Sequence, residues 1–292
     1  MFLGSHVSIA GGLHKAFPIA QEIGCTAVQI FTKNASQWNA KPLQPKEIAQ
    51  FQDAWQAGGM LPVVAHDSYL INLATPDPEL LQKSQAAMLI ELERCEQLGI
   101  PYLVMHPGSH VGVGEDAGLQ RVAASFDSIH AQTGGYQTQI LVETTAGQGT
   151  NLGYRFEHLA QIFALVNAPE RLGVCFDTCH AFAAGYELRT AAGYQATFAA
   201  FDRLIGLARL KALHLNDSVK GLGSRVDRHA DIGKGLIGLD GFRLLMNDAR
   251  FAALPHILET PKGKNPIAAD QANLQILRNL LTTALLPAET IC

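Results

Sequence analysis

The order of apolar and polar positions along the chain alternates between two patterns. Short runs rich in β-branched and other apolar residues, typical of buried strands, are separated by segments with helical spacing, such as Glu79–Leu98 and Arg155–Val166. Alternation of this kind indicates an α/β protein, a (β/α)8 TIM barrel. We expect its strands at Leu3–Ser8, Ala27–Thr32, Pro62–Ser68, Tyr102–Gly108, Gln139–Thr145, Leu172–Thr178, Leu210–Asp217 and His256–Thr260.

The domain organisation follows from the length of 292 residues, which suits one large barrel. We therefore expect residues 1–292 to form a single domain. Ser218 to Gly238 is the only long irregular stretch that we expect, and a loop that long usually carries function. An open doubly wound sheet is the alternative fold, but it would have fewer strands and a Gly-rich first turn. The stretch "AGGLHKA" from Ala10 lacks that spacing.

Polar side chains lie near the carboxyl ends of six consecutive predicted strands. They are His66, His106, Glu143, Asp177, His214 and Glu259. In a closed barrel these strand ends converge on the face where barrel enzymes keep their active sites. Any one of these residues alone could be an ordinary hydrogen-bonded residue. Together they would be costly to desolvate without cations, and His with Asp and Glu suits zinc or manganese, so we expect a polynuclear metal centre.

Three more residues extend this set of candidate ligands. His180 follows Asp177 by three residues, just past the sixth strand, and Asp227 and His229 lie two apart in the long loop. The total of nine side chains is enough for three ions if one carboxylate bridges and water completes the shells.

The overall charge and the ends of the chain limit the function classes. The formal net charge of −4 is not the basic footprint of a protein held on nucleic acid by charge alone. No apolar run is long enough to span a membrane, and the first residues lack the pattern of a signal peptide, so we expect a cytoplasmic protein without membrane contact.

The stretch "LGVCFDTCHAF" suggests at first a cysteine-based zinc site. The chain has an odd number of cysteines, 5, with no C-x-x-C pair. Cys175 shares a strand face with Asp177 but lies deeper in the barrel, so we expect it to pack the interior. Cys179 is expected to pack in the turn, and Cys292 to be a reduced thiol like the others.

A second stretch, "GKGLIG" at Gly233 to Gly238, matches the G-x-G-x-x-G fingerprint of dinucleotide sites. The preceding "VDRHADI" is too polar to form the buried strand that the fingerprint requires. We therefore do not expect a dinucleotide site.

The longest motifs resemble those of the endonuclease IV family of apurinic/apyrimidinic endonucleases. The resemblance covers Gly4 to Glu259 and follows the family order. It rests on "GSHVSIAGGL", "FTKN", "HDSYLINLA", "HPGSH", "ETTAGQGTNLG", "GVCFDTCHAFAAGY", "HLNDS", "GSRVDRHADIG" and "ILET".

The resemblance implies a (β/α)8 barrel with three Zn²⁺ ions. His66 and His106 would hold one zinc, bridged through Glu143 to a second. Asp177, His214 and Glu259 would complete the second site, and the third would be held by His180, Asp227 and His229. The implied reaction is hydrolysis of the phosphodiester 5′ to an abasic site, leaving a 3′-hydroxyl and a 5′-deoxyribose phosphate, with removal of 3′-blocking groups. Glu143 would be the catalytic bridge, and Glu259 would orient or deprotonate the nucleophile.

The resemblance also implies contacts with double-stranded DNA that contains abasic sites or blocked 3′ ends. Tyr69 and Leu70 match the family's DNA-penetrating pair. A second recognition loop would contribute Asn34, Gln37 and Trp38. Candidate phosphate contacts are Arg228, Lys220, Arg225, Lys234 and Lys33. Ser36 stands where some family members have an arginine, so substrate preference can differ. We expect a monomer without an obligatory protein partner.

Two other function classes remain open at this point. A sugar isomerase or epimerase of the xylose isomerase type would also surround its strand ends with His, Asp and Glu, but it would leave His180, Asp227 and His229 unexplained. A damaged-DNA binding module with structural zinc would favour thiolate ligands. A metal count would separate the first of these from the nuclease.

Overall fold

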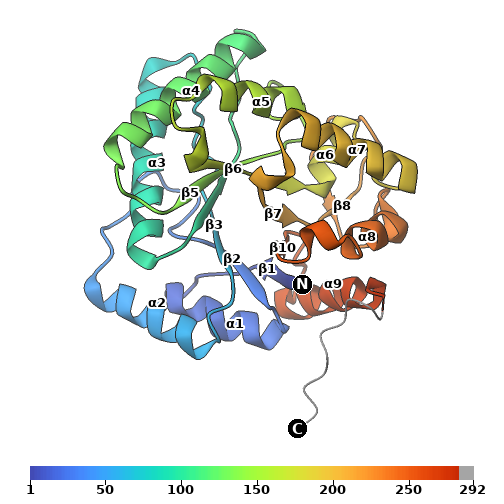
Figure 1. The fold of residues 1–292 in the computed structure, drawn as a ribbon. Coiled ribbons are helices and arrows are strands. Elements are labelled where there is room, and N and C mark those ends of the chain that lie inside the picture. Colours follow the sequence, from blue (N-terminus) through green and yellow to red (C-terminus); the bar gives the residue numbers. More distant parts are fainter. Residues whose placement is uncertain (283–292) are drawn as a thin grey trace.

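The structure is a computed structural model that describes residues 1–282. Its strands form a closed parallel barrel in the order β1-β10-β7-β6-β5-β4-β3-β2, surrounded by helices (Figure 1). The barrel strands are β1 (Phe2–His6), β2 (Ala27–Phe31), β3 (Val63–His66), β4 (Tyr102–Met105), β5 (Gln139–Glu143), β6 (Leu172–Asp177), β7 (Leu210–His214) and β10 (Pro255–Leu258). The predicted (β/α)8 fold and its strand positions are confirmed.

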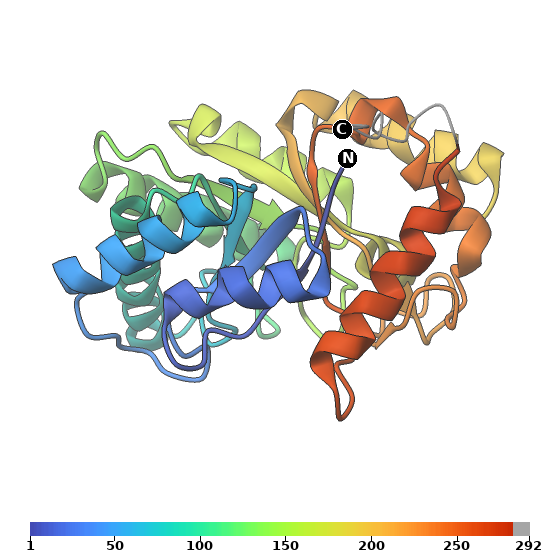
Figure 2. The same cartoon turned by 90° about the horizontal axis from the view of Figure 1, so that it is seen from below.

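Helices follow the strands and cover the outside of the barrel. They are α1 (Ala16–Ile23), α2 (Pro45–Ala57), α3 (Pro78–Leu98), α4 (Glu115–Gln132), α5 (Phe156–Leu165), α6 (Thr178–Ala184), α7 (Ala191–Leu204), α8 (Gly238–Met246) and α9 (Pro266–Leu280). Helices α1 and α9 pack against each other beside the first strand, which completes the ring (Figure 2). The helices predicted at Glu79–Leu98 and Arg155–Val166 are α3 and α5.

The ends of α3 show how local sequence sets a helix boundary. Asp77 accepts hydrogen bonds from the backbone N–H groups of Glu79 and Leu80, which would otherwise lack partners at the start of the helix. Pro78 occupies the first helical position, where no N–H is needed. Gly99 ends the helix at a φ of 74°, a conformation that favours glycine.

Apolar packing fills the barrel interior as well as the layer between strands and helices. The interior cluster consists of Val64, Val104, Leu141, Cys175 and Ala212, all fully buried. The prediction that Cys175 packs the interior is thus confirmed. The thiols of Cys25, Cys95 and Cys179 are also buried and free, whereas Cys292 lies outside the described residues.

The long segments at the carboxyl-terminal face differ in part from prediction. The stretch from Ser218 to Gly238 contains a short antiparallel hairpin, β8 (Asp217–Ser218) with β9 (His229–Ala230). The expectation that it is the only long irregular stretch is wrong, because residues 32–44 form another long segment, which contains neither helix nor strand. Among the described residues, no helix is long and apolar enough to cross a membrane.

Candidate metal centre

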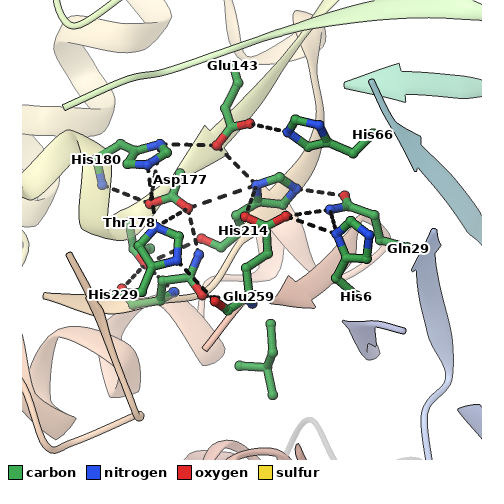
Figure 3. A network of polar contacts seen from close by, with 12 residues as sticks. His6, Gln29, His66, Glu143, Asp177, Thr178, His180, His214, His229 and Glu259 are labelled. Carbon is green, nitrogen blue, oxygen red and sulfur yellow. Dashed lines mark hydrogen bonds and ion pairs between the residues drawn. The ribbon is translucent and has the colours of Figure 1, made fainter. Parts of the chain in front are cut away.

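The barrel brings the predicted strand-end residues together at one face. His66, Glu143, Asp177 and His214 are the last residues of β3, β5, β6 and β7. His106 and Glu259 directly follow β4 and β10. Their side chains converge on a common centre, as Figure 3 shows for those that it labels. The predicted clustering is therefore present in the folded chain.

Glu143 lies at the middle of this cluster and is fully buried. Its Oε2 atom is 3.2 Å from Nε2 of His66 and 3.2 Å from Nε2 of His106. Its Oε1 atom is 3.1 Å from Nδ1 of His214 and 3.1 Å from Nδ1 of His180. The two oxygens thus face different sets of imidazoles, which is the arrangement that a bridging carboxylate needs.

Asp177 is the last residue of β6 and connects this strand to α6, which carries His180. Its Oδ1 atom accepts a hydrogen bond from the backbone N–H of His180 at 2.8 Å, which caps α6. This cap fixes the turn, so His180 projects over the same rim as Asp177. The prediction that His180 lies just past the strand on the shared face is confirmed.

The hairpin carries the remaining two candidates to the same place. Asp227 Oδ2 is 3.3 Å from Nε2 of His180, and Asp227 Oδ1 is 3.4 Å from Nε2 of His229. The two Nε2 atoms of His180 and His229 are 3.4 Å apart. The long loop therefore delivers its D-x-H pair to the barrel end, as predicted.

Backbone carbonyl groups contact the Nδ1 atoms of three imidazoles and thereby orient the rings. The Nδ1 atoms of His66, His180 and His229 are 3.0, 2.9 and 3.1 Å from the carbonyl oxygens of Asp67, Thr144 and Glu259. A carbonyl only accepts, so these Nδ1 atoms carry the hydrogens. In neutral rings the Nε2 lone pairs then face carboxylates, and those of His180 and His229 face each other. Cations between these atoms would remove the repulsion, so the residues fit a metal centre.

The charges of the cluster shift its pKa values strongly. Burial lowers the pKa of His180, but Asp177 and Asp227 raise it well above its usual range. Burial raises the pKa of Glu143, but His214 and His106 hold it well below its usual range. The pKa of Asp227 is lowered to about 2 despite burial, chiefly by its contact with His180. The carboxylates therefore attract positive charge, and protons compete with metal for these sites.

The possible ligand atoms fall into compact groups. The groups are His66–His106–Glu143, Glu143–Asp177–His214–Glu259, His180–Asp227–His229 and Asp177–Cys179–His229. The first three match the predicted division into three sites with Glu143 shared. In the fourth, burial raises the pKa of the Cys179 thiol to about 12. This thiol points at the carbonyl oxygen of Arg228, at 3.7 Å.

The centre opens into a cavity of about 560 Å³ that is lined by His66, Tyr69, His106, His180, Asp227, Arg228, His229, Glu259 and Pro261. Tyr69 stands at its rim with 63% of its surface exposed. A neighbouring cavity of about 520 Å³ is lined by Asn34, Tyr69 and Glu259, among others. Three predicted DNA-contact residues, Tyr69, Arg228 and Asn34, therefore lie beside the candidate metal centre.

The remaining predicted DNA-contact residues, Gln37, Leu70 and Trp38, are not among the residues that line these two cavities. Gln37 is exposed, and Leu70 is half-buried. Trp38 is half-buried against the core, with Nζ of Lys83 4.5 Å from the centre of its ring. Ser36 is exposed, and its N–H donates to the side chain of Asn34.

Several candidate phosphate contacts are already engaged within the chain. The prediction for Lys33 is wrong, because its Nζ atom is buried, lies 3.0 Å from Glu91 Oε1 and donates to the carbonyl of Gln37. The guanidinium of Arg225 stacks on the ring of Tyr154 at 3.7 Å. Lys220 and Lys234 are exposed, and Lys234 pairs with Asp231 at 2.9 Å.

The G-x-G-x-x-G stretch wraps around a carboxylate of the chain itself. The side chain of Asp217 is fully buried and accepts hydrogen bonds from the backbone N–H groups of Gly233, Gly235 and Ile237, at 2.9 to 3.0 Å. A ring of N–H groups that could bind a phosphate is thus filled by Asp217. These hydrogen bonds to Asp217 explain why the G-x-G-x-x-G stretch does not form a dinucleotide site.

Two amide side chains that contact the ligand candidates were not predicted from the sequence. Asn216 Nδ2 donates to Asp177 Oδ2 at 2.6 Å, and Asn216 Oδ1 accepts from the N–H of Glu259 at 2.8 Å. Gln29 contacts both His214 and Glu259. A buried glutamine inside the apolar run "AVQIF" was the available signal for the second of these.

A closed barrel with His, Asp and Glu side chains at the carboxyl ends of its strands defines a class of metal-binding barrel proteins. Residues 17–280 match the model of the family described as "Xylose isomerase-like TIM barrel". Solved structures with the same barrel fold include the 3-keto-D-glucoside 4-epimerase YcjR from E. coli, with a TM-score of 0.67 over 96% of this chain and 99% of that one. Its sequence identity of 16% shows the shared fold alone.

Sequence similarity places the chain within that class. It is 58% identical over 281 residues to "Probable endonuclease 4" of Chloroflexus aurantiacus, covering 96% of this chain and 98% of that protein. The crystal structure of endonuclease IV from Thermus thermophilus superposes with a TM-score of 0.85 at 40% identity, over 96% of this chain and 98% of that one. The chain belongs to the endonuclease IV family. This confirms the nuclease interpretation over the sugar isomerase and the DNA-binding module.

Proposed function

We propose that the protein is a zinc-dependent apurinic/apyrimidinic endonuclease of base excision repair. It hydrolyses the phosphodiester 5′ to an abasic site in double-stranded DNA, leaving a 3′-hydroxyl and a 5′-deoxyribose phosphate, and it removes 3′-blocking groups. The observation that carries the proposal is the arrangement around Glu143, in which imidazole lone pairs and carboxylates face one another beside an open cavity.

The proposed ligands form three sets that share Glu143. The first is His66, His106 and Glu143, the second is Glu143, Asp177, His214 and Glu259, and the third is His180, Asp227 and His229. Nitrogen and carboxylate ligands in sets of three or four suit zinc. When bound, zinc lowers the pKa of water and neutralises charge on the phosphate that reacts.

The two proposed catalytic carboxylates differ in their access to substrate. Glu143 is fully buried, so its part is to hold the first two sets together. Glu259 borders both cavities at the barrel mouth. Its carboxylate can therefore orient the attacking water and accept its proton, whereas Glu143 cannot reach the substrate.

Binding of damaged DNA rests on the rim of the cavity. An abasic nucleotide leaves the stack at lower cost than a normal one because its base is already missing. Tyr69, exposed at the rim, can fill the gap with Leu70, and Asn34, Gln37 and Trp38 lie on the loop beside it. Arg228 and Lys220 are exposed on the hairpin and can meet phosphates. Three Zn²⁺ ions would turn the formal net charge of −4 positive, with the field focused at the cavity.

We further propose that residues 1–292 act as one barrel domain, with the DNA-recognition loops at the carboxyl-terminal face of the strands. A long duplex must reach this open face. We therefore propose a monomer that needs no protein partner.

The decisive experiment is incubation of the zinc-loaded protein with a duplex that contains one abasic site. The expected result is a single nick on the 5′ side of that site, with a 3′-hydroxyl that a polymerase can extend. An undamaged duplex of the same sequence is the control. Intact damaged duplex after incubation with fully loaded protein would refute the proposal.

A further inference from the structure

A single amide side chain joins two of the proposed ligands. Gln29 lies in the middle of β2, is fully buried, and points toward His214 and Glu259 (Figure 3). Its Nε2 atom is 2.6 Å from Oε1 of Glu259, and its Oε1 atom is 2.8 Å from Nε2 of His214. The two contacts come from opposite ends of one rigid amide group.

The chemistry of these groups leaves one hydrogen-bonding arrangement. The carboxylate of Glu259 only accepts, so the amide atom that faces it must be the donor Nε2. The Oε1 atom of Gln29 then faces His214, and only an N–H at Nε2 of His214 can satisfy it. In the neutral ring, the lone pair of His214 is therefore on Nδ1. That atom is 3.1 Å from Glu143 Oε1 and 3.3 Å from Glu259 Oε2.

A third residue, His6 at the end of β1, contacts both groups. Its Nδ1 atom is 3.0 Å from Nε2 of Gln29 and 3.3 Å from Oε1 of Glu259. The orientation of the amide is set by Glu259, whose carboxylate only accepts. A flipped amide would place its oxygen against the Glu259 carboxylate, where two acceptors would repel.

We propose that Gln29 is a positioning residue of the metal centre. It fixes His214 as the Nε2–H tautomer and holds Oε1 of Glu259, so that Nδ1 of His214 and Oε2 of Glu259 both face the same ion. The proposal rests on the metal centre proposed above and concerns the second set, Glu143, Asp177, His214 and Glu259. Backbone carbonyls do this for His66, His180 and His229, whereas for His214 a replaceable side chain does it.

Two substitutions separate the parts of this role. Gln29→Met keeps a similar volume but makes neither hydrogen bond. Gln29→Glu keeps an acceptor for His214 but cannot donate to Glu259 and adds repulsion there. The matched control is Gln139→Met, because Gln139 is also a strand glutamine and donates to the carbonyls of Glu170 and Leu172 at the amino end of β5.

The readouts are zinc retention against graded chelator and the tautomer of His214 by nitrogen-15 NMR of the metal-free protein, recorded at a pH above the raised pKa of His214 so that the ring is neutral. We expect Gln29→Met to bind one zinc about 10- to 100-fold more weakly and to show mixed His214 tautomers. Gln29→Glu should keep the Nε2–H tautomer and still lose zinc affinity, while Gln139→Met retains zinc like the wild-type protein. Thermal melting of each metal-free variant shows whether it is folded.

Two results would overturn the inference while leaving the proposed function intact. One is a Gln29→Met protein that retains zinc as tightly as a zinc-binding wild-type protein. The other is an Nδ1–H tautomer of His214 in the metal-free wild-type protein. A wild-type protein that takes up no zinc at all would instead refute the metal centre itself, which makes the two failures distinguishable.

Discussion

At the residue scale, Glu143 is the side chain whose substitution should have the largest effect. Both of its oxygens face imidazoles within 3.2 Å, and it belongs to two of the three proposed metal sets. Its side chain is also fully buried.

We expect Glu143→Gln to lose zinc and to slow nicking by at least about 100-fold, because a neutral amide cannot bridge two cations. Metal content by mass spectrometry and the rate on an abasic duplex measure the two effects. Glu115→Gln is the control, since Glu115 also contacts a histidine, His158, but lies away from the centre. A Glu143→Gln protein with normal zinc content and rate would contradict the bridging role.

Tyr69 should act on DNA and not on metal. Its ring lies edge-on to Phe31 at 5.6 Å between centroids, yet most of its surface is exposed at the cavity rim. We expect Tyr69→Ala to bind abasic duplex about 10-fold more weakly, the loss of one aromatic stacking contact, with unchanged zinc content. Tyr69→Phe keeps the ring and serves as the control. Binding assays on damaged duplex would show equal affinity for all three proteins if the ring has no such role.

At the element scale, the hairpin and the turn after it depend on Asp217. The N–H groups of Gly233, Gly235, Ile237 and Gly238 surround its carboxylate. They thereby hold the end of the segment that carries Asp227 and His229. A Cβ atom at Gly235 would lie 2.4 Å from Oδ1 of Asp217 and 2.6 Å from the carbonyl oxygen of Ser218.

We expect Gly235→Ala to displace this segment, to lower the free energy of unfolding by about 1–3 kcal/mol and to weaken zinc binding at the third set. Gly221→Ala is a matched control in the same loop, because a Cβ atom there meets nothing within 4 Å. Urea denaturation and zinc content measure both effects. Equal behaviour of the two alanine variants would show that the contacts around Asp217 do not position the hairpin.

The elements that sequence could predict are those with a periodic signal. The barrel strands are compact apolar runs, and six consecutive ones have a candidate ligand at or directly after their carboxyl end, so both the strand and the ligand could be predicted. Strands β8 and β9 have two residues each, too short for any period to show. The contacts of Lys33 with Glu91 and of Gln29 with Glu259 could not be predicted, because only the folded chain brings these distant residues together.

At the scale of the whole molecule, the barrel end opposite the metal centre has its own sensitivity to acid, through His256. His256 lies near the start of β10, at the end opposite the metal centre, where its Nδ1 atom is 3.2 Å from the carbonyl of Phe2. Burial lowers its pKa from 6.5 to about 4. In the unfolded chain this imidazole takes up a proton at a higher pH than in the folded protein. Its contribution to stability is therefore present above pH 6.5 and is lost as the pH falls from 6.5 toward 4.

We expect His256→Asn to reduce the acid sensitivity of folding. The asparagine amide can still donate to the carbonyl of Phe2 but does not titrate. Urea denaturation at pH 7 and pH 5 should show a pH slope smaller than that of the wild-type protein by up to about 1.4 kcal/mol per pH unit. Zinc release at low pH affects both proteins alike, so the difference isolates His256. Identical slopes would mean that this imidazole is not held neutral by burial.

The pairing of β1 with β10 sets an order in which the centre can be assembled. Leu3 lies opposite His256 in this pair, so the ring closes between residues from the two ends of the chain. Glu259 follows β10 directly and reaches Gln29 only across this seam. During synthesis, His66 through His229 emerge before the last strand exists. A nascent chain can therefore gather most of its proposed ligands early, but it completes the second metal set only when the barrel closes. If the second set binds zinc as proposed, its occupancy would report that the barrel has closed.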